Sequence, residues 1–251
     1  MELNDRMMDR DTFLTLLQPL GLPQISPAAF DRLAVYAQML CEKNKVMNLT
    51  AIREDDDVYV RHFVDSLAVY AALPQIPSRL IDVGCGGGFP GLPLKILFDD
   101  LRGDGETRLT LLDATKKKID FLAEVCQTLG LKNVTTLSGR AEEVAADAKH
   151  REQYDLVVSR AVADLRILGE LCLPFAKPGG HFAPHKSDRA DEEIAGAELT
   201  CIRMGGRQVG QFVYTISPDA PKSRVLIFEK QSHTPAGYPR PFAKIKTKPL
   251  K

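Results

Sequence analysis

The chain has 251 residues, of which 44% are hydrophobic and 26% are charged, so it suits one large globular domain, or a core domain with an added segment. Its 33 basic and 33 acidic residues argue against a surface that binds nucleic acid all over, although a local basic patch stays possible. The polar, acidic N-terminus does not resemble a secretory signal, and no apolar run approaches the ~20 residues that span a membrane. The cysteines are scattered and form no Cys-x-x-Cys pair, which argues against a disulfide framework or a metal site. We therefore expect a cytoplasmic protein without membrane contact.

The first third of the chain is predicted to be helical. Apolar residues at helical spacing between Phe13 and Leu20 indicate one amphipathic helix. A second helix is predicted to begin at Ser26-Pro27, because serine caps a helix and proline fits its first turn. A third is predicted from Asp57 to Leu73. We therefore expect residues 1–76 to form a helical segment packed on the rest of the protein.

After this segment, short apolar runs alternate with helical patterns. The clearest helix runs from Thr115 to Leu129, and Gly130 ends it. The predicted strands are residues 80–83, 109–112, 134–137, 156–158 and 225–228. This alternation predicts an α/β fold with a mostly parallel, doubly wound sheet and right-handed crossovers. We expect this core over residues 77–232, followed by a basic tail at 233–251.

The most informative stretch is LIDVGCGGGFPG, residues 80–91, in which a strand runs into a glycine cluster and then a helix. Residues 86–91 match the dinucleotide pattern G-x-G-x-x-G, but five glycines in a short span satisfy many patterns. The loop of S-adenosylmethionine (SAM) sites fits better, because an acid precedes its first glycine and can organise the loop or meet the methionine ammonium. That fit uses Asp82, Gly84, Gly86 and Gly88. A dinucleotide site and a purely structural turn remain alternatives.

Two later positions fit an adenosine ligand. Asp113 ends the second strand, where a carboxylate can accept both ribose hydroxyls in either a SAM or an NAD site; the alternative is a helix N-cap. The loop that ends at Glu142 follows the third strand and passes the adenine in SAM domains. The alternative for Glu142 is a solvated helix start, which the helix dipole favours.

The loop after the fourth strand restricts the methyl acceptor. It carries Ser159-Arg160-Ala161 and lacks the Asn/Asp-Pro-Pro-aromatic motif of exocyclic-amine methylation. No cysteine lies there, and Cys172 belongs to an apolar pattern that predicts burial, so methylation of carbon through a thiolate adduct is disfavoured. What remains is an acceptor atom that already carries a lone pair.

With these motifs the chain resembles the RsmG (GidB) family of bacterial 16S ribosomal RNA methyltransferases over about residues 30–250. The matching stretches are NKVMNLT at 44–50, RHFVDSL at 61–67, the DVG and FPG parts of the glycine loop, SRA at 159–161, HK at 185–186 after the fifth strand, YPR at 238–240 and KPL at 248–250. The resemblance implies a Rossmann-like class I SAM-dependent methyltransferase. It also implies methyl transfer to N7 of a guanine, expected at position 527 of 16S ribosomal RNA, with the RNA or the 30S subunit as partner and no obligate protein partner.

The resemblance also implies roles for single residues. SAM would contact Gly84, Phe89, Asp113, Ala141, Glu142 and Arg160. Asn48, Arg61, His62, Asp65 and Lys186 would face the cleft, and Asn48, Arg160 and Lys186 would act at the catalytic step.

Each of these roles has a simpler alternative. Arg61 and Asp65, four residues apart, could form only a surface ion pair, and His62 could be an interior histidine with its hydrogen bonds satisfied. Because Arg160 would repel a sulfonium unless a carboxylate intervened, we expect it to bind the SAM carboxylate, a phosphate or a protein acid.

RNA binding requires cations. Lys116, Lys117 and Lys118 fall in the first turn of a predicted helix, where the dipole disfavours positive charge, so we expect an RNA contact; the alternative is a solvated face. Residues 240–251 contain five basic residues and no acid, so they would bind phosphates or be disordered. A small-molecule methyltransferase, a SAM- or RNA-binding protein without catalysis and an NAD oxidoreductase remain alternative functions.

Overall fold

The computed structural model describes residues 8–47, 55–187, 191–216 and 220–250, and within them seven strands form one sheet. The strand order is β3-β2-β1-β4-β5-β7-β6. The first five strands are parallel, and β7 runs antiparallel to both of its neighbours. The order reverses between β1 and β4, which is where doubly wound sheets bind ligands at the carboxyl ends of their strands.

The strands are β1 (Arg79–Val83), β2 (Arg108–Asp113), β3 (Val134–Ser138), β4 (Tyr154–Ser159), β5 (Ala176–Ser187), β6 (Gly206–Tyr214) and β7 (Ser223–Lys230). The helices are α1 (Arg10–Leu17), α2 (Pro27–Met47), α3 (Asp55–Val58), α4 (Asp65–Ala72), α5 (Gly91–Arg102), α6 (Lys116–Thr128), α7 (Ala141–Val144), α8 (Leu165–Cys172), α9 (Asp191–Arg203) and α10 (Phe242–Thr247). Short segments η1 (Gln18–Leu20), η2 (Tyr59–Val64) and η3 (Leu173–Phe175) connect some of them.

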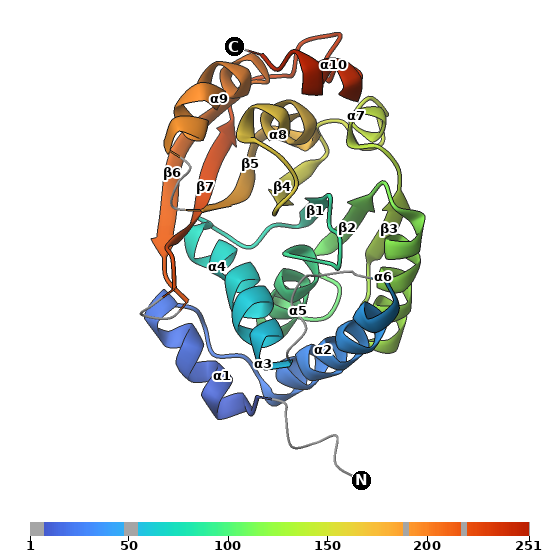
Figure 1. Ribbon diagram of the computed structural model, residues 1–251, viewed down its shortest axis with the longest axis vertical. Coiled ribbons are helices and arrows are strands. Elements are labelled where there is room, and N and C mark those ends of the chain that lie inside the picture. Colours follow the sequence, from blue (N-terminus) through green and yellow to red (C-terminus); the bar gives the residue numbers. More distant parts are fainter. Residues whose placement is uncertain (1–7, 48–54, 188–190, 217–219, 251) are drawn as a thin grey trace.

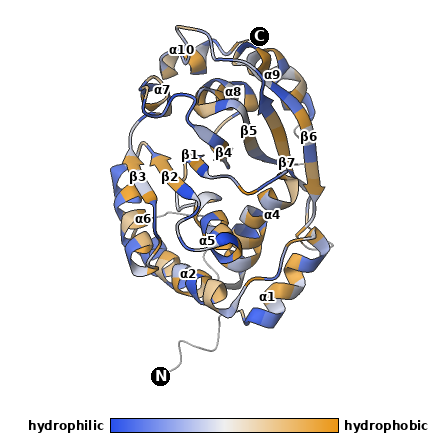
Figure 2. Ribbon diagram, turned by 180° about the vertical axis from the view of Figure 1, so that it is seen from behind, coloured by the Kyte–Doolittle hydropathy of each residue, from blue (hydrophilic) through white to orange (hydrophobic). Residues whose placement is uncertain are grey.

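The sheet lies between two helical layers, α1 to α6 on one side and α7 to α10 on the other (Figure 1). Alternate strand residues face opposite layers. The register partners Leu80 and Leu156 belong to the core under α2, α4 and α5, whereas the next pair, Ile81 and Val157, belongs to the core under α8 and α9. Figure 2 shows hydrophobic and hydrophilic colours side by side on α1 and α2, as expected for helices with one buried face.

The predicted helices of the first third are confirmed. α2 begins at Pro27, and the Ser26 hydroxyl caps it by accepting the Ala29 N–H at 3.2 Å. The predicted third helix is a continuous helical stretch, α3–η2–α4, but its middle is a π-helical segment, Tyr59–Val64. Such wider turns recur at functional sites, and this one carries Arg61 and His62.

Two expectations about the sheet need correction. β5 extends to Ser187, so His185 and Lys186 lie inside the fifth strand and not after it, because the chain stays paired with Arg224 and Val225 of β7. No range was predicted for the strand expected before His185, and β6 was not predicted at all. It is an edge strand with mostly exposed residues, so the sequence lacks the apolar run or alternation that marks a buried strand.

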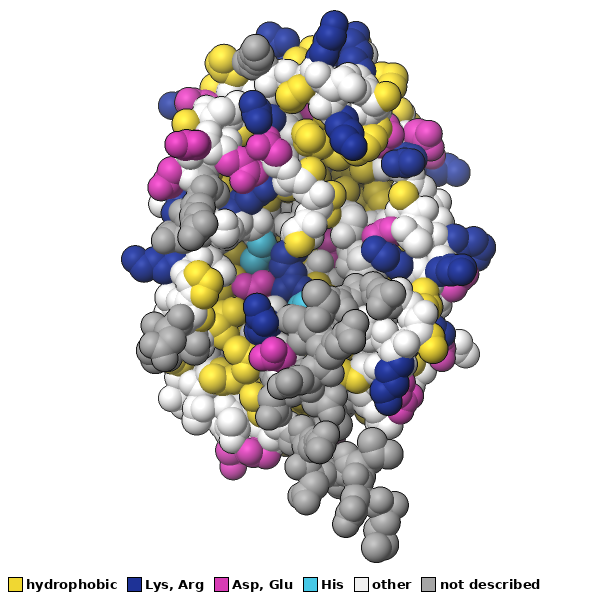
Figure 3. Space-filling view, viewed as in Figure 1, with side chains coloured by type: hydrophobic (Ala, Val, Ile, Leu, Met, Phe, Trp, Pro, Cys, Tyr) yellow, Lys and Arg dark blue, Asp and Glu magenta, His cyan; other side chains and the backbone are white. Residues whose placement is uncertain are grey.

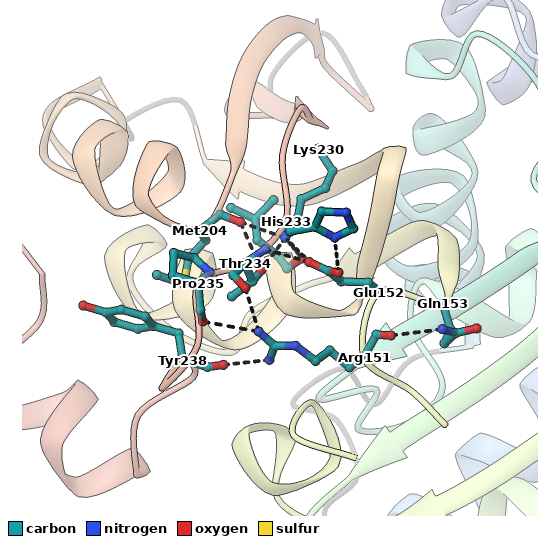
Figure 4. A network of polar contacts seen from close by, with 10 residues as sticks. Arg151, Glu152, Gln153, Met204, Lys230, His233, Thr234, Pro235 and Tyr238 are labelled. Carbon is teal, nitrogen blue, oxygen red and sulfur yellow. Dashed lines mark hydrogen bonds and ion pairs between the residues drawn. The ribbon is translucent and has the colours of Figure 1, made fainter. Parts of the chain in front are cut away.

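The C-terminal residues pack against the core. Ile245 of α10 is fully buried, and Arg240 makes forked hydrogen bonds of 2.8 and 2.6 Å to the buried carboxylate of Glu170 in α8. Upstream, the Arg151 guanidinium donates to the carbonyls of Thr234 and Tyr238 at 2.8 and 2.7 Å (Figure 4). Arg240 therefore stabilises the fold and is not free to bind a phosphate.

Candidate active site at the carboxyl ends of the strands

The glycine loop is anchored by Asp82 at the end of β1. This side chain is fully buried, and its Oδ2 accepts the Gly91 N–H at 2.8 Å, at the start of α5. A Cβ on Gly91 would lie 2.8 Å from Asp82, so only glycine permits this close approach. Asp82 thereby fixes the path of the chain from β1 through the loop into α5.

The second oxygen of Asp82 makes no hydrogen bond to the described residues. Among the described residues Oδ1 is buried without a hydrogen-bond partner, and burial raises the pKa of Asp82 to about 7, although the Gly91 N–H and the charge of Arg160 lower it. A buried carboxylate in this state gains from a cationic donor. The ammonium of SAM is such a donor and a nicotinamide dinucleotide has none, so these residues fit SAM.

Asp113 connects the glycine loop to the next helix. Its Oδ2 accepts the Gly86 N–H at 3.0 Å and its Oδ1 accepts the Thr115 N–H at 2.8 Å, ahead of α6. Each carboxylate oxygen keeps a further acceptor site, so these bonds are compatible with binding ribose hydroxyls. The alternative role of Asp113, capping a helix, is also partly correct, because its Oδ1 accepts a backbone N–H just before α6.

The glycines of the loop serve different purposes. Gly86 has φ +54°, and a Cβ there would meet nothing closer than 4.0 Å, so its backbone is open to a ligand. Gly84 has φ +74°, and a Cβ there would lie 2.6 Å from Val162 of the β4–α8 loop. Gly88 is packed under Tyr36 and Leu92. The dense glycine cluster thus reflects internal packing as well as ligand access.

Phe89, at the end of the loop, is the centre of a stacked cluster. The His62 ring lies against it with centroids 4.3 Å apart and planes 16° apart, and the Arg160 guanidinium lies 5.1 Å from the ring centroid. Tyr36 of α2 stacks on it at 5.5 Å. The loop, the π-helical segment and the end of β4 therefore meet at one aromatic ring.

Arg160 is held by three acceptors. Nη1 donates to Asp65 Oδ2 at 2.7 Å and to the Arg61 carbonyl at 3.1 Å, and Nη2 donates to His62 Nδ1 at 2.7 Å. Because Nδ1 accepts this bond, His62 is neutral. Burial and the charge of Arg160 lower the pKa of His62 to about 3. We expected Arg160 to bind the SAM carboxylate, a phosphate or a protein acid, and the structure shows the last of these, Asp65.

Asp65 accepts hydrogen bonds from Arg160, Tyr214 and His185. Its Oδ1 accepts the Tyr214 hydroxyl at 2.5 Å, and its carbonyl accepts from His185 Nε2 at 2.8 Å. Burial raises the pKa of Asp65, but His185, Arg160 and the Tyr214 hydroxyl lower it below its ordinary value. Figure 3 shows acidic, basic and histidine side chains gathered near the centre of one face of the molecule. Sequence reasoning missed Tyr214, because β6 gave no strand signal.

The simpler alternative for Arg61 and Asp65, a surface ion pair between them, is not what the structure shows. Arg61 is exposed and lies 3.6 Å from Asp57, while Asp65 pairs with Arg160. Both carboxylate oxygens of Asp65 are instead taken by Arg160 and Tyr214, which the fold brings to it from distant parts of the chain.

The other predicted site residues lie outside the group of side chains around Phe89 and Asp65. The Lys186 ammonium donates to the Ala163 carbonyl at 2.8 Å and pairs with Glu193, so its charge is compensated inside the protein. Lys116 pairs with the exposed Asp120 at 2.7 Å. The remaining positions are the half-buried Ala141 and Glu142 at the start of α7, the exposed Lys117 and the half-buried Lys118. Asn48 lies outside the described residues.

The described residues contain neither a metal-binding cluster nor a membrane-spanning helix. No group of histidine, cysteine or acidic side chains there is arranged to hold a metal ion. No helix in the described ranges is long and apolar enough to cross a membrane. Cys172 is buried in α8, as its apolar pattern predicted.

Comparison with known proteins gives a consistent result. A family model described as rRNA small subunit methyltransferase G (GidB) matches residues 30–215. A "Ribosomal RNA small subunit methyltransferase G" from Alkaliphilus metalliredigens is 42% identical over 93% of this chain and 95% of that protein, and one from Lachnoclostridium phytofermentans is 40% identical over 97% and 98%. Among solved structures, the PH0226 protein from Pyrococcus horikoshii aligns with a TM-score of 0.52 at 15% identity, covering 75% of this chain and 98% of that one. The predicted Rossmann-like fold class is confirmed.

Proposed function

Because the chain belongs to the ribosomal RNA small subunit methyltransferase G family, we propose that it transfers a methyl group from SAM to N7 of a guanine in 16S ribosomal RNA. The observation that carries this proposal is the meeting of the glycine loop with the Asp65–Arg160 pair at Phe89. A cofactor loop of the SAM type and a polar cluster suited to an acceptor lie together at the carboxyl ends of β1 and β4.

The residues around the loop are suited to hold the cofactor. Asp82 offers a buried oxygen to the ammonium, Gly86 offers open backbone, and Asp113 offers acceptors to the ribose. We assign adenine contacts to Ala141 and Glu142 at the start of α7, and a wall of the site to Gly84, Gly88 and Phe89. SAM, when bound, supplies a methyl group on a positively charged sulfur.

The acceptor requires no proton transfer. Guanine N7 has a lone pair and no proton at neutral pH, so the protein must position the base and need not deprotonate it. His62 fits this requirement, because its low pKa keeps the ring neutral and its Nδ1 is occupied by Arg160. The Asp65 carboxylate compensates the charge of Arg160, which removes the repulsion between that guanidinium and a sulfonium. We assign Arg160 and His62 to positioning of the guanine.

The remaining assignments concern the RNA. We assign Asn48 and Lys186 to the acceptor side of the cleft and Arg61, Lys116, Lys117 and Lys118 to phosphate contacts at its rim. A guanine in a loop must be turned out of its stack to reach the cleft. The partner is then 16S ribosomal RNA or the assembling 30S subunit, in the cytoplasm.

Methyl-labelled SAM with undermethylated 16S ribosomal RNA or 30S subunits tests the proposal, with the label mapped by mass spectrometry. Label on N7 of a single guanine is the expected result. RNA methylation should also fall steeply with salt, whereas SAM binding should not. If SAM binds but no RNA is labelled, the small-molecule methyltransferase or the non-catalytic binding protein replaces this proposal. If the protein binds NADH in place of SAM, the interpretation of the glycine loop is wrong.

A further inference from the structure

A second candidate site lies at the opposite end of the sheet. A groove of about 550 Å³ opens at the amino ends of β1 to β4, where its polar lining includes Arg79, Arg108, Thr110, Asn133 and Thr135. Because β2 has six residues, its two ends are about 20 Å apart, at ~3.3 Å per residue. The groove is therefore separate from the glycine loop and the Asp65–Arg160 cluster.

Two arginines stand side by side in this groove. Arg79 of β1 and Arg108 of β2 are register partners on neighbouring parallel strands, so both side chains leave the same face of the sheet. None of the residues lining the groove is acidic, and no described carboxylate lies within ion-pair distance of either guanidinium. Adjacent like charges destabilise a sheet unless something compensates them.

The two guanidiniums are also largely uncommitted. Arg79 lies over the Tyr154 ring at 5.4 Å and makes one long hydrogen bond, 3.4 Å, to Gln153. Arg108 is exposed and has no hydrogen bond or ion pair to any described side chain. By contrast, the largely buried Arg160 and Arg240 each pair with a carboxylate. The free N–H donors of Arg79 and Arg108 make the groove suited to an anion.

The remaining lining groups specify the kind of anion. Thr135, the register partner of Thr110, presents an exposed hydroxyl beside the arginines. Tyr154 is only 2% exposed, so its ring cannot stack on a base. Donors without an aromatic face favour contact with phosphate oxygens over recognition of a base.

We propose that this groove binds phosphate groups and that, given the function proposed above, the phosphates are those of the RNA backbone. A substrate that contacts both ends of the sheet must span about 20 Å, which a folded RNA does and a small methyl acceptor does not. The groove thus orients the RNA from a distance while the guanine enters the cleft.

The test compares the exposed-arginine variants Arg108→Gln and Arg207→Gln in the full chain. Arg207 is exposed on β6 at the other edge of the sheet and serves as the matched loss of charge. Affinity for undermethylated 16S ribosomal RNA is measured across a salt series. Arg108→Gln should reduce the slope of log K against log salt by about one unit, with SAM affinity unchanged, whereas Arg207→Gln should keep the wild-type slope.

A second measurement separates the groove from the proposed function. Inorganic pyrophosphate is titrated into the isotope-labelled protein, and NMR shifts should appear at residues 108–110 and 133–135 in wild type and Arg207→Gln but not in Arg108→Gln. Equal salt slopes in all three proteins, or no shifts in the groove, overturn the inference. If wild type neither binds nor methylates RNA, the proposed function and the RNA assignment fail together, and the pyrophosphate shifts alone decide whether the groove binds phosphate.

Discussion

The Tyr214 hydroxyl donates a hydrogen bond of 2.5 Å to Oδ1 of Asp65, whose Oδ2 accepts from Arg160 at 2.7 Å. One carboxylate on α4 therefore joins the edge strand β6 to the end of β4. Because both oxygens have a fixed donor, the carboxylate cannot rotate without breaking a charge-assisted hydrogen bond. The orientation of Arg160 over Phe89 follows from this arrangement.

Tyr214→Phe removes only the hydroxyl and tests this relationship. We expect a loss of about 1–3 kcal/mol in the free energy of unfolding, because a buried carboxylate loses one donor. Since Asp65 then holds Arg160 less firmly, kcat for RNA methylation should fall by about tenfold while KM for SAM stays near its wild-type value. Denaturant unfolding and steady-state kinetics measure the two effects. A variant less stable but with unchanged kcat would show that Tyr214 is purely structural.

His62 should make the protein sensitive to acid. In the unfolded chain histidine takes up a proton near pH 6.5, whereas folded His62 resists protonation until about pH 3. Its contribution to stability is thus present above pH 6.5 and is lost as the pH falls from 6.5 toward 3, at up to about 1.4 kcal/mol per pH unit. The stability difference between wild type and His62→Gln, followed by denaturant unfolding, should shrink over that range. A constant difference would mean that His62 titrates normally.

Asp82 should make cofactor binding depend on pH. Its pKa of about 7 in the free protein means that part of the population is protonated at neutral pH, and an ammonium prefers the ionised form. SAM affinity should therefore fall as the pH drops below about 7. Asp82→Asn keeps an oxygen for the Gly91 N–H but has no charge, so it should bind SAM about tenfold more weakly and without this pH dependence. Calorimetry across pH 6 to 8 measures both, and an unchanged pH profile in Asp82→Asn would contradict the ammonium contact.

Arg240 tests the role of the C-terminal residues. It pairs with Glu170, whose side chain is fully buried, so Arg240→Ala leaves an uncompensated carboxylate in the core. We expect a loss of about 3–5 kcal/mol in the free energy of unfolding. Lys246→Ala, on the same basic segment and exposed, should cost less than about 0.5 kcal/mol. Equal stability of the two variants would return Arg240 to the set of candidate phosphate ligands.

The parts of the fold that the sequence predicted are those with a local signal. The run LIDV before a glycine cluster and the cap Ser26-Pro27 depend on neighbouring residues only, and both appear where expected. β6 lacked such a signal, because an exposed edge strand needs little apolar pattern. The pairing of β5 with β7 carried His185 and Lys186 into a strand, and that depends on residues about 40 positions away.

In the candidate site, too, the residues were predictable from the sequence but their long-range partners were not. The family resemblance implied site roles for His62, Asp65, Phe89 and Arg160, and the structure brings these four together. The choice of partners was not predictable, because only the folded sheet places Arg160 and Tyr214 beside Asp65. The roles of Lys186 and Lys116 in RNA binding stay predictions, since both are paired with acids in the structure.

The central claim is that the cluster held by Asp65 is where RNA is methylated, and Arg160→Lys tests it most directly. Lysine keeps the charge opposite Asp65 but lacks the planar fork that reaches Asp65 and His62 together. Single-turnover transfer of labelled methyl from SAM to undermethylated 16S ribosomal RNA should slow by about 100-fold, with SAM affinity within about threefold of wild type. Wild-type transfer rates in this variant, with SAM bound normally, would contradict the account and move the acceptor site away from Arg160.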